Sequence, residues 1–159
     1  MLKIQKIDTC SISILKQCLK ISVELFGKNY HNIHFFNTEK KIKIIAITNQ
    51  LVIGFLIAKK INIETIKIES IVVKKKYQSK YIGTSLMSYF FEHFTSKRTK
   101  IIAHAWKSLN GTHAKKLFEK FDLKAIKNNG YIWKKECNIK FKCSFYQNQC
   151  CCQSVLYAK

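Results

Sequence analysis

The sequence contains no proline, few acidic residues and no long hydrophobic run. Its longest apolar runs, such as residues 51–58, are far too short to span a bilayer, which excludes a membrane-spanning helix. The N-terminal residues, MLKIQKID, lack the apolar segment of a signal peptide, so we expect a cytoplasmic protein with reduced thiols. The missing proline accompanies abundant Ile, Lys and Asn, and we attribute it to a biased genome rather than to function.

The charge of the chain is strongly unbalanced. There are 29 Lys and Arg against nine Asp and Glu, which gives a formal net charge of +20 at pH 7. Such a charge attracts polyanions, whether nucleic acid, a membrane surface or a phosphate-rich cofactor. Lysine is frequent throughout the chain and no compact basic helix stands out, so charge alone does not distinguish these partners.

The composition predicts a single folded domain over residues 1–159. The chain is 47% apolar and 13% aromatic, which provides for a sizeable core and excludes a disordered protein. No repeat or linker divides the chain. A cysteine-rich loop over residues 137–152 is expected to precede the last short strand, residues 154–157.

The apolar periodicity predicts an alternation of strands and helices. Strands are predicted over residues 3–7, 43–48, 51–61, 66–73, 99–105, 123–126, 131–135 and 154–157. Helices are predicted over residues 14–26, 82–94 and 110–121. Thr9 or Ser11 can cap the first helix and Gly27 can end it, while residues 28–41 form either a short helix or a loop.

The most informative stretch joins strand 66–73 to helix 82–94 through a polar, basic turn. The first N–H groups of such a helix point into the turn without intrahelical partners, and the helix dipole adds partial positive charge. Gly83 would let a phosphate come close to the backbone. The stretch therefore predicts an anion site, although a plain βα unit has the same outline.

The alternation of apolar residues changes phase within strand 66–73. Ile66 and Ile68 fall on one face of a regular strand, whereas Ile71 and Val73 fall on the other. A phase change of this kind is the expected trace of a β-bulge. Glu69, the only acid in the strand, lies beside the expected bulge.

Two motifs carry a resemblance to a known family. Val73, Gln78 and Gly83 resemble the acyl-CoA signature of the GNAT superfamily of N-acyltransferases, with Tyr81 at the place of the usual first glycine. Residues 117–123 (LFEKFDL) resemble a second GNAT stretch, usually written Leu, Tyr, Glu, Lys, two variable residues and Phe. In this stretch Phe118 replaces the frequent tyrosine and Asp122 a frequent glycine. The resemblance covers residues 1–135 in element order and residues 154–159 as a closing strand.

The resemblance implies an α/β (α+β) fold with a mixed, mostly antiparallel sheet flanked by helices and acyl-CoA in a central cleft beside a bulged strand. It implies an acetyl-CoA-dependent N-acetyltransferase that moves the acetyl group directly to a primary amine of a small molecule or peptide. Two alternatives stay open. One is a toxin-type enzyme that acetylates aminoacyl-tRNA, supported by the charge and by the stretch IIAHA. The other is a catalytically weak CoA-binding protein. We expect no membrane partner, and a monomer or a homodimer.

The resemblance also implies roles for individual residues. Backbone groups of the bulged strand would bind the pantetheine amides, and the turn would bind the pyrophosphate. The implied cofactor-binding residues are Val72, Val73, Lys74, Gln78, Ser79, Lys80, Tyr81, Ile82, Gly83 and Thr84. The acceptor side would be built from residues 25–40 and from the loop before the last strand.

Glu69 matches the position at which many GNAT enzymes keep a general base. The alternative is a solvent-facing strand residue in a salt bridge with Lys67 or Lys74. A backbone N–H of Val73 would polarise the thioester carbonyl. Phe118 cannot supply a proton to the leaving thiolate, so Tyr131 is the candidate acid, with Tyr81 and His104 as further candidates.

The cysteines leave three readings open. Cys137, Cys143, Cys150 and Cys152 could bind zinc, but their spacing is not that of a standard zinc knuckle. Thiols among so many lysines would ionise readily. A disulfide or unligated thiols are the favoured readings, and His31 and His34 lack a third ligand, so we assign no metal ligand.

Overall fold

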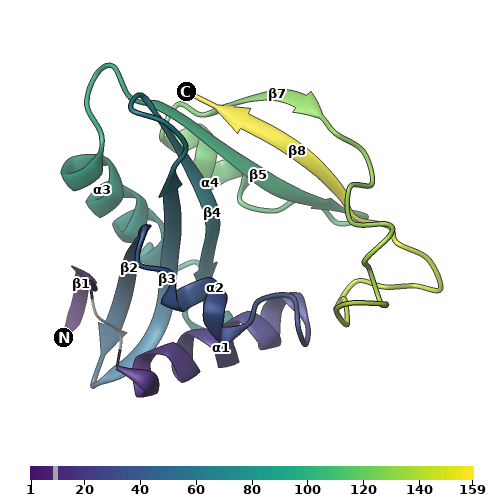
Figure 1. The fold of residues 1–159 in the computed structure, drawn as a ribbon, viewed down its shortest axis with the longest axis horizontal. Coiled ribbons are helices and arrows are strands. Elements are labelled where there is room, and N and C mark those ends of the chain that lie inside the picture. Colours follow the sequence, from purple (N-terminus) through teal and green to yellow (C-terminus); the bar gives the residue numbers. More distant parts are fainter. Residues whose placement is uncertain (9–10) are drawn as a thin grey trace.

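The computed structural model describes residues 1–8 and 11–159, which form an eight-stranded sheet with helices on both faces (Figure 1). In chain order the elements are β1 (Leu2–Lys6), α1 (Ile12–Phe26), α2 (Ile33–Asn37), β2 (Lys41–Thr48), β3 (Leu51–Lys60), β4 (Thr65–Val73), the 3-10 turn η1 (Lys75–Tyr77), α3 (Ile82–Phe94), β5 (Lys100–Ser108), β6 (Gly111–Thr112), α4 (Lys115–Lys120), β7 (Lys124–Asn128) and β8 (Gln153–Ala158). Among the described residues, no helix has the length and apolar character needed to cross a bilayer.

The strands follow the order β1-β2-β3-β4-β5-β8-β7, with β6 attached to β5. β4 and β5 run parallel, whereas the other neighbouring strands in the described part of the chain are antiparallel. A parallel step needs a crossover connection, and α3 supplies it. The predicted fold class, a mixed and mostly antiparallel sheet flanked by helices, is therefore confirmed.

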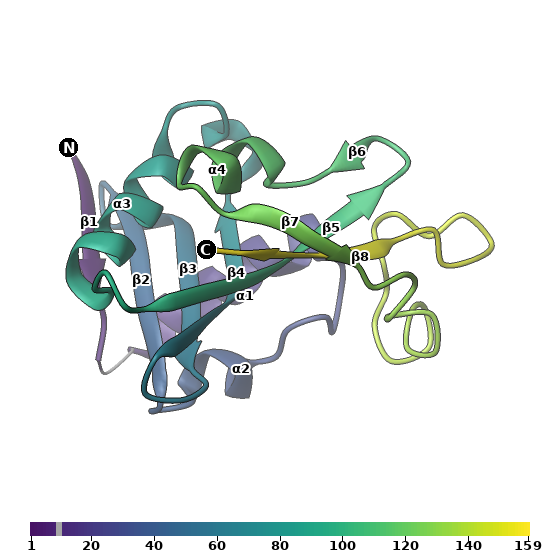
Figure 2. The ribbon, with the colours of Figure 1, turned by 90° about the horizontal axis from the view of Figure 1, so that it is seen from above.

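Helices cover the two faces of the sheet separately (Figure 2). The three-and-four spacing of apolar residues in α3 gives it one buried face, which packs on the sheet. The buried α3 residues are Ile82, Leu86, Met87 and Phe90. The opposite face of the sheet packs against α1 and α2. The helix residues buried there are Leu15, Cys18, Ile21 and Phe36.

The predicted β-bulge lies in β4, at Glu69. Ser70 pairs with Ile57 of β3 and Ile68 pairs with the next residue, Ala58, so Glu69 is the extra residue of the bulge. The predicted faces were wrong in one respect. Ile66 and Ile68 pack in the same cluster as Ile71 and Val73, because the extra residue turns the strand by half a period.

The bulge marks the point at which the sheet opens. Pairing between β4 and β5 ends at Ile68 and Ala103, one residue before Glu69. Beyond this point β4 stays with β3, while β5 continues along β8, and the two strands diverge in Figure 1. The edge of β4 after the bulge therefore faces a gap in the sheet instead of a neighbouring strand.

The predicted helix over residues 110–121 was too long. Residues 111–112 form β6, which folds back against β5, and Ala114 has a left-handed conformation with φ 61°. A left-handed residue interrupts a right-handed helix, so α4 begins only at Lys115.

The predicted strand over residues 131–135 was also wrong. These residues form consecutive turns, and β7 pairs with β8 instead. The turn residues Asn128, Asn129 and Gly130 were read as a hairpin, but the chain leaves the sheet there and returns only at Gln153.

The N-terminal half of the chain follows the prediction closely. Ser11 caps α1 by accepting a hydrogen bond from the N–H of Ile14, and Gly27 ends the helix with φ 101°. Thr9, the alternative cap, lies outside the described residues. β2 and β3 form the predicted hairpin through Asn49 and Gln50, both left-handed.

Candidate active site

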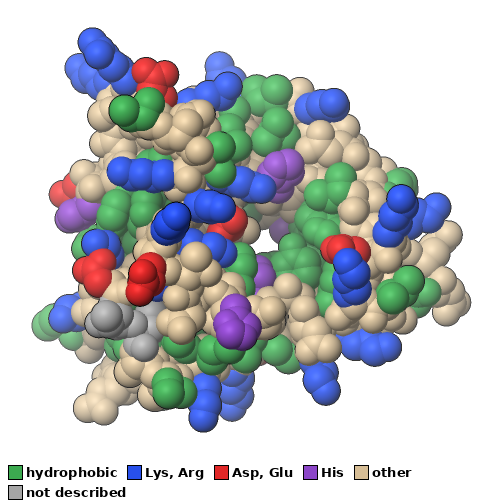
Figure 3. Space-filling model, in the orientation of Figure 1, with side chains coloured by type: hydrophobic (Ala, Val, Ile, Leu, Met, Phe, Trp, Pro, Cys, Tyr) green, Lys and Arg blue, Asp and Glu red, His purple; other side chains and the backbone are tan. Residues whose placement is uncertain are grey.

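A cavity of about 1140 Å³ occupies the gap between β4 and β5. Its walls come from the C-terminal half of β4, the turn that follows, the start of α3, β5, α4 and the end of α1. Figure 3 shows the molecule hollowed at this point, with charged, histidine and hydrophobic side chains around the opening. The volume is that of a ligand site rather than of a packing defect.

The edge of β4 presents free backbone to the cavity. The N–H of Lys74 donates to the carbonyl of Ile53 on β3, at 2.8 Å. Because backbone groups alternate in an antiparallel ladder, the N–H and carbonyl of Val73 then point to the opposite edge, toward β5. The side-chain amide of Gln78 donates to this Val73 carbonyl, at 3.0 Å. Gln78 therefore ties the turn to the end of β4 and leaves the Val73 N–H open to the cavity.

The start of α3 forms the second wall. Ser79 and Tyr81 are left-handed, with φ 59° and 60°, and Tyr81 directly precedes the helix. No described side chain caps α3, so the first N–H groups, those of Ile82, Gly83 and Thr84, point out of the helix end without intrahelical partners. The left-handed backbone of Tyr81 explains why a glycine is usual at its position in the resembled signature.

Gly83 lies where α3 approaches its neighbours closely. A Cβ built on it would lie 3.2 Å from Cδ2 of Leu117 on α4 and 3.9 Å from Cγ2 of Val73. The small residue thus allows α4 to pack beside the helix start.

Most of the predicted cofactor-binding residues line this cavity, but not all of them do. The lining includes Val72, Val73, Gln78, Ser79, Tyr81, Ile82, Gly83 and Thr84. Lys74 and Lys80 lie outside the described lining, and other lysines take their place. These are Lys75, Lys115, Lys116 and Lys120. The α4 lysines were missed because the predicted helix had no assigned role.

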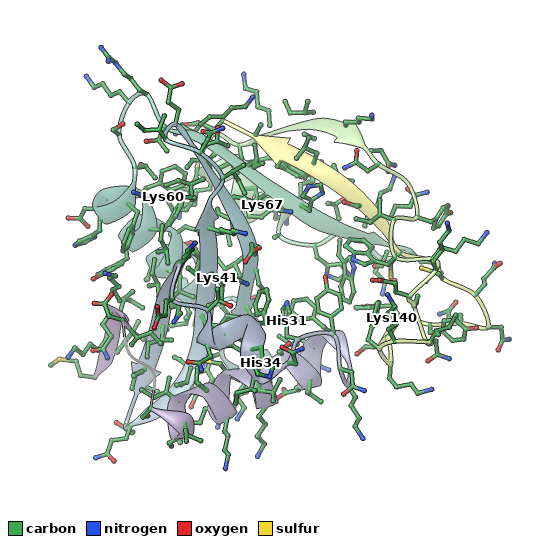
Figure 4. All side chains as sticks on the ribbon, in the orientation of Figure 1. His31, His34, Lys41, Lys60, Lys67 and Lys140 are labelled. Carbon is green, nitrogen blue, oxygen red and sulfur yellow. The ribbon has the colours of Figure 1, made fainter. Side chains whose placement is uncertain are left out.

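Glu69 lines the cavity and is held by a lysine from a distant strand. Its Oε2 lies 2.7 Å from Nζ of Lys41, and both side chains are largely buried. The Lys41 ammonium also lies over the ring of Phe35, 3.7 Å from its centre. The expected partners, Lys67 and Lys74, were therefore wrong. Figure 4 shows Lys41 reaching across the sheet toward the gap, with Lys67 further along it.

The candidate acid Tyr131 is not brought to this site. It is half exposed and lies outside the described lining of the cavity. His104 does line the cavity, and its Nδ1 lies 2.8 Å from Oγ of the fully buried Ser154. Burial, with a smaller effect of Lys67, lowers the pKa of His104, so its imidazole is neutral at pH 7.

An aromatic cluster forms the end of the cavity nearest α1, and sequence reasoning missed it. Trp106 of β5 lies at its centre. The centre of its ring lies 5.0 Å from the ring centre of Phe26, 5.5 Å from that of Tyr30, 5.9 Å from that of Trp133 and 5.4 Å from that of Phe145. Burial raises the pKa of Tyr30 to about 12, partly offset by a hydrogen bond from Trp133. The five rings come from three separate segments, so no local spacing could have revealed the cluster.

The cysteine-rich loop behaves differently from the prediction that its thiols would ionise readily. Burial, followed by the neighbouring thiols, raises the pKa of Cys137 to about 12 and also raises that of Cys152. Within the described residues, the five cysteines of this loop form no disulfide bond. Across residues 1–8 and 11–159, no group of three or more His, Cys, Asp or Glu side chains could hold a metal ion.

The two histidines near α2 have separate environments. His31 is buried, and its Nδ1 lies 2.7 Å from Oγ of Ser22. Burial, with a contribution from Lys41, lowers the pKa of His31 to about 3. His34 is exposed.

Residues 14–123, more than half of the chain, match the family described as "Acetyltransferase (GNAT) family". The chain belongs to this family. A search of curated proteins gave no match.

Solved structures of other proteins share the fold of this chain. The chain aligns with an aminoglycoside 6'-N-acetyltransferase complexed with coenzyme A at 15% identity and a TM-score of 0.77, covering 99% of this chain and 96% of that one. A GNAT acetyltransferase from Elizabethkingia anophelis with acetyl-CoA bound gives 15% identity, a TM-score of 0.73 and coverage of 99% and 96%. The ribosomal-protein-S18-alanine N-acetyltransferase from Escherichia coli aligns at 12% identity with a TM-score of 0.75, and the alignment covers 99% of this chain and 92% of that one.

Proposed function

We propose that this protein is an acetyl-CoA-dependent N-acetyltransferase that acts on a primary amine of a small molecule or peptide. The observation that carries the proposal is the joining, in one cavity, of the open edge of β4 and the uncapped start of α3. One presents a row of backbone groups and the other a cluster of N–H donors with the positive end of a helix dipole. Together they fit a long ligand with amides at one end and phosphates at the other.

The pyrophosphate would lie at the start of α3, against the N–H groups of residues 82–84. The lysines of η1 and α4 that line the cavity add positive charge there. The pantetheine would run along the edge of β4. Because Lys74 bonds to β3, the alternation favours Ile71 and Val73 over Val72 and Lys74 as the residues whose backbone meets its amides.

Bound acetyl-CoA would supply a thioester, whose C–S bond breaks as the new C–N bond forms. The N–H of Val73 points into the cavity and is the proposed donor to the carbonyl oxygen. Glu69 is the proposed base that takes the proton from the amine, with neutral His104 as the second candidate. The CoA thiol is acidic enough to leave unassisted, and the position of Tyr131 outside the cavity argues against it as the acid.

The pairing of Glu69 with Lys41 fits this role. The ammonium keeps the carboxylate in one orientation at the bulge, where the sheet opens. A carboxylate whose orientation is fixed by an ion pair can accept a proton from a ligand in the cavity without first changing its conformation.

A product-mass screen tests the proposal. Purified protein and acetyl-CoA are incubated with panels of amines, peptides and charged tRNA, and products heavier by one acetyl group are identified. Glu69→Gln should lower kcat/KM for the best acceptor by about 10²- to 10⁴-fold. Glu64→Gln, in the exposed turn before β4, is the matched control. Equal activity of wild type and Glu69→Gln would remove Glu69 as the base.

Acetylation of aminoacyl-tRNA is the second candidate, because the net charge of +20 suits a polyanionic acceptor. Its signature is tRNA binding that weakens steeply with salt, since phosphate contacts release counterions. A small amine would show little such dependence. Tight, salt-sensitive binding of tRNA would favour aminoacyl-tRNA over a small molecule or peptide as the acceptor.

A further inference from the structure

The acceptor end of the cavity has aromatic walls. Phe26 and Tyr30 close it from the end of α1, Trp106 from β5, and Trp133 and Phe145 from the segment between β7 and β8. Ring-bearing side chains gather between His31 and Lys140 in Figure 4, where this segment approaches the α1–α2 connection. Aromatic walls favour a flat, apolar ligand body, and their faces also attract cations.

Apart from Glu69, which pairs with Lys41, two residues of the cavity have a buried polar group without a hydrogen-bond partner within the described residues. The indole N–H of Trp106 and the hydroxyl of Ser70 make no hydrogen bond within the described residues, and each residue is only 8% exposed. Both residues line the cavity. A buried donor without a partner is costly in free energy, so native structures rarely keep one. Here the two groups are placed to bond with a ligand that carries an oxygen.

Charge is divided along the cavity. Glu24 and Glu69 line it beside α1 and β4, whereas its lysines come from η1 and α4. Two of the nine acids of a strongly basic chain thus face this one cavity. Because Glu69 is already paired with Lys41, Glu24 is the carboxylate of this lining that would attract an ammonium group, as the lysines of η1 and α4 would attract phosphates.

We propose that the acceptor is an arylalkylamine, a small primary amine that carries an aromatic ring. The ring lies among the rings around Trp106, and a hydroxyl oxygen on the ring forms a hydrogen bond with Trp106 or Ser70. This substrate class rests on the proposed acetyl transfer at the same site. A cluster that served only to anchor the segment between β7 and β8 would not need an unpaired indole N–H in the cavity.

The test compares kcat/KM for tyramine, phenethylamine, hexylamine and spermidine at fixed acetyl-CoA. We expect the two aryl amines to exceed hexylamine and spermidine at least about tenfold, and tyramine to exceed phenethylamine through its phenol oxygen. Trp106→Phe keeps a ring but removes the N–H, and Ser70→Ala removes the hydroxyl. We expect one or both to reduce the ratio of tyramine to phenethylamine toward one. Tyr146→Phe, an exposed phenol in the same segment, is the matched control and should leave the ratio unchanged.

The outcomes separate the two proposals. Aliphatic amines or peptides that match or exceed the aryl amines would overturn the substrate class and leave the acetyl transfer standing. A ratio unaffected in both variants would overturn the role of the buried donors. Binding of acetyl-CoA with no acetylation of any aryl amine would also overturn the substrate class. Failure to bind acetyl-CoA would overturn the proposed function itself. Melting temperatures of the variants distinguish each of these from loss of fold.

Discussion

Gly54 of β3 lies where the backbones of two central strands leave no room for a side chain. A Cβ built on it would lie 2.8 Å from the carbonyl oxygen of Val72 on β4. This atom belongs to the backbone of a central strand and cannot move aside as a side-chain end can, so Gly54→Ala must push β3 and β4 apart. Overpacking of this kind costs about 1–3 kcal/mol. For a chain of this size that corresponds to a fall in melting temperature of roughly 2–12 °C.

Gly83→Ala is the matched comparison. Its Cβ would meet the flexible end of Leu117 at 3.2 Å, and alanine favours the helix over glycine by about 0.8–1 kcal/mol. The two effects oppose each other, so we expect a melting temperature within about 2 °C of the wild type. Because Gly54 pairs with Val73, Gly54→Ala should also weaken binding of acetyl-CoA, whereas Gly83→Ala should not.

Scanning calorimetry with and without acetyl-CoA measures both effects. If Gly54→Ala melts at the same temperature as Gly83→Ala, the close approach of β3 and β4 does not restrict position 54 to glycine. If Gly54→Ala is less stable but binds acetyl-CoA like the wild type, the end of β4 does not hold the cofactor.

Three further predictions rest on single side chains. Tyr81→Gly should raise the free energy of unfolding by up to about 1 kcal/mol in chemical denaturation, because Tyr81 has φ 60°; an unchanged value would argue against strain there. Burial and Lys41 lower the pKa of His31 to about 3 in the folded chain. As the pH falls, His31 therefore binds a proton in the unfolded chain before it does so in the folded chain. Stability should therefore fall by about 1.4 kcal/mol per pH unit from pH 6.5 toward pH 3, and His31→Gln should lack this slope. Cys137 and Cys152, buried and with raised pKa, should react with a thiol reagent at pH 8 more slowly than the other loop cysteines, as peptide mass mapping would show.

The sequence predicted features that depend on neighbours along the chain. The phase change in β4 located the bulge, and the turn before α3 indicated a helix start at which N–H groups lack intrahelical partners. Ser11 and Gly27 marked the ends of α1 because capping is a local interaction. Tyr81 stood out as a departure from a glycine, and its left-handed backbone explains why a glycine is usual at that position.

Features that depend on distant segments escaped prediction. Lys41 reaches Glu69 across β3, a contact set by strand order rather than by spacing. The rings around Trp106 meet only because β5 diverges from β4 and the segment after β7 folds over the gap. The strand expected over residues 131–135 had a suitable composition, but β8 already occupies the edge beside β7.

The central claim is that the cleft between β4 and β5 binds acetyl-CoA against the start of α3. Isothermal titration calorimetry of acetyl-CoA into the purified protein tests it most directly. We expect saturable binding with a dissociation constant between about 1 μM and 1 mM, the usual range for enzyme substrates. Gly83→Val, whose branched side chain would press against Leu117 and Val73 at the start of α3, should abolish it, while Gly83→Ala should retain it. A folded protein that releases no heat at millimolar acetyl-CoA would contradict the claim.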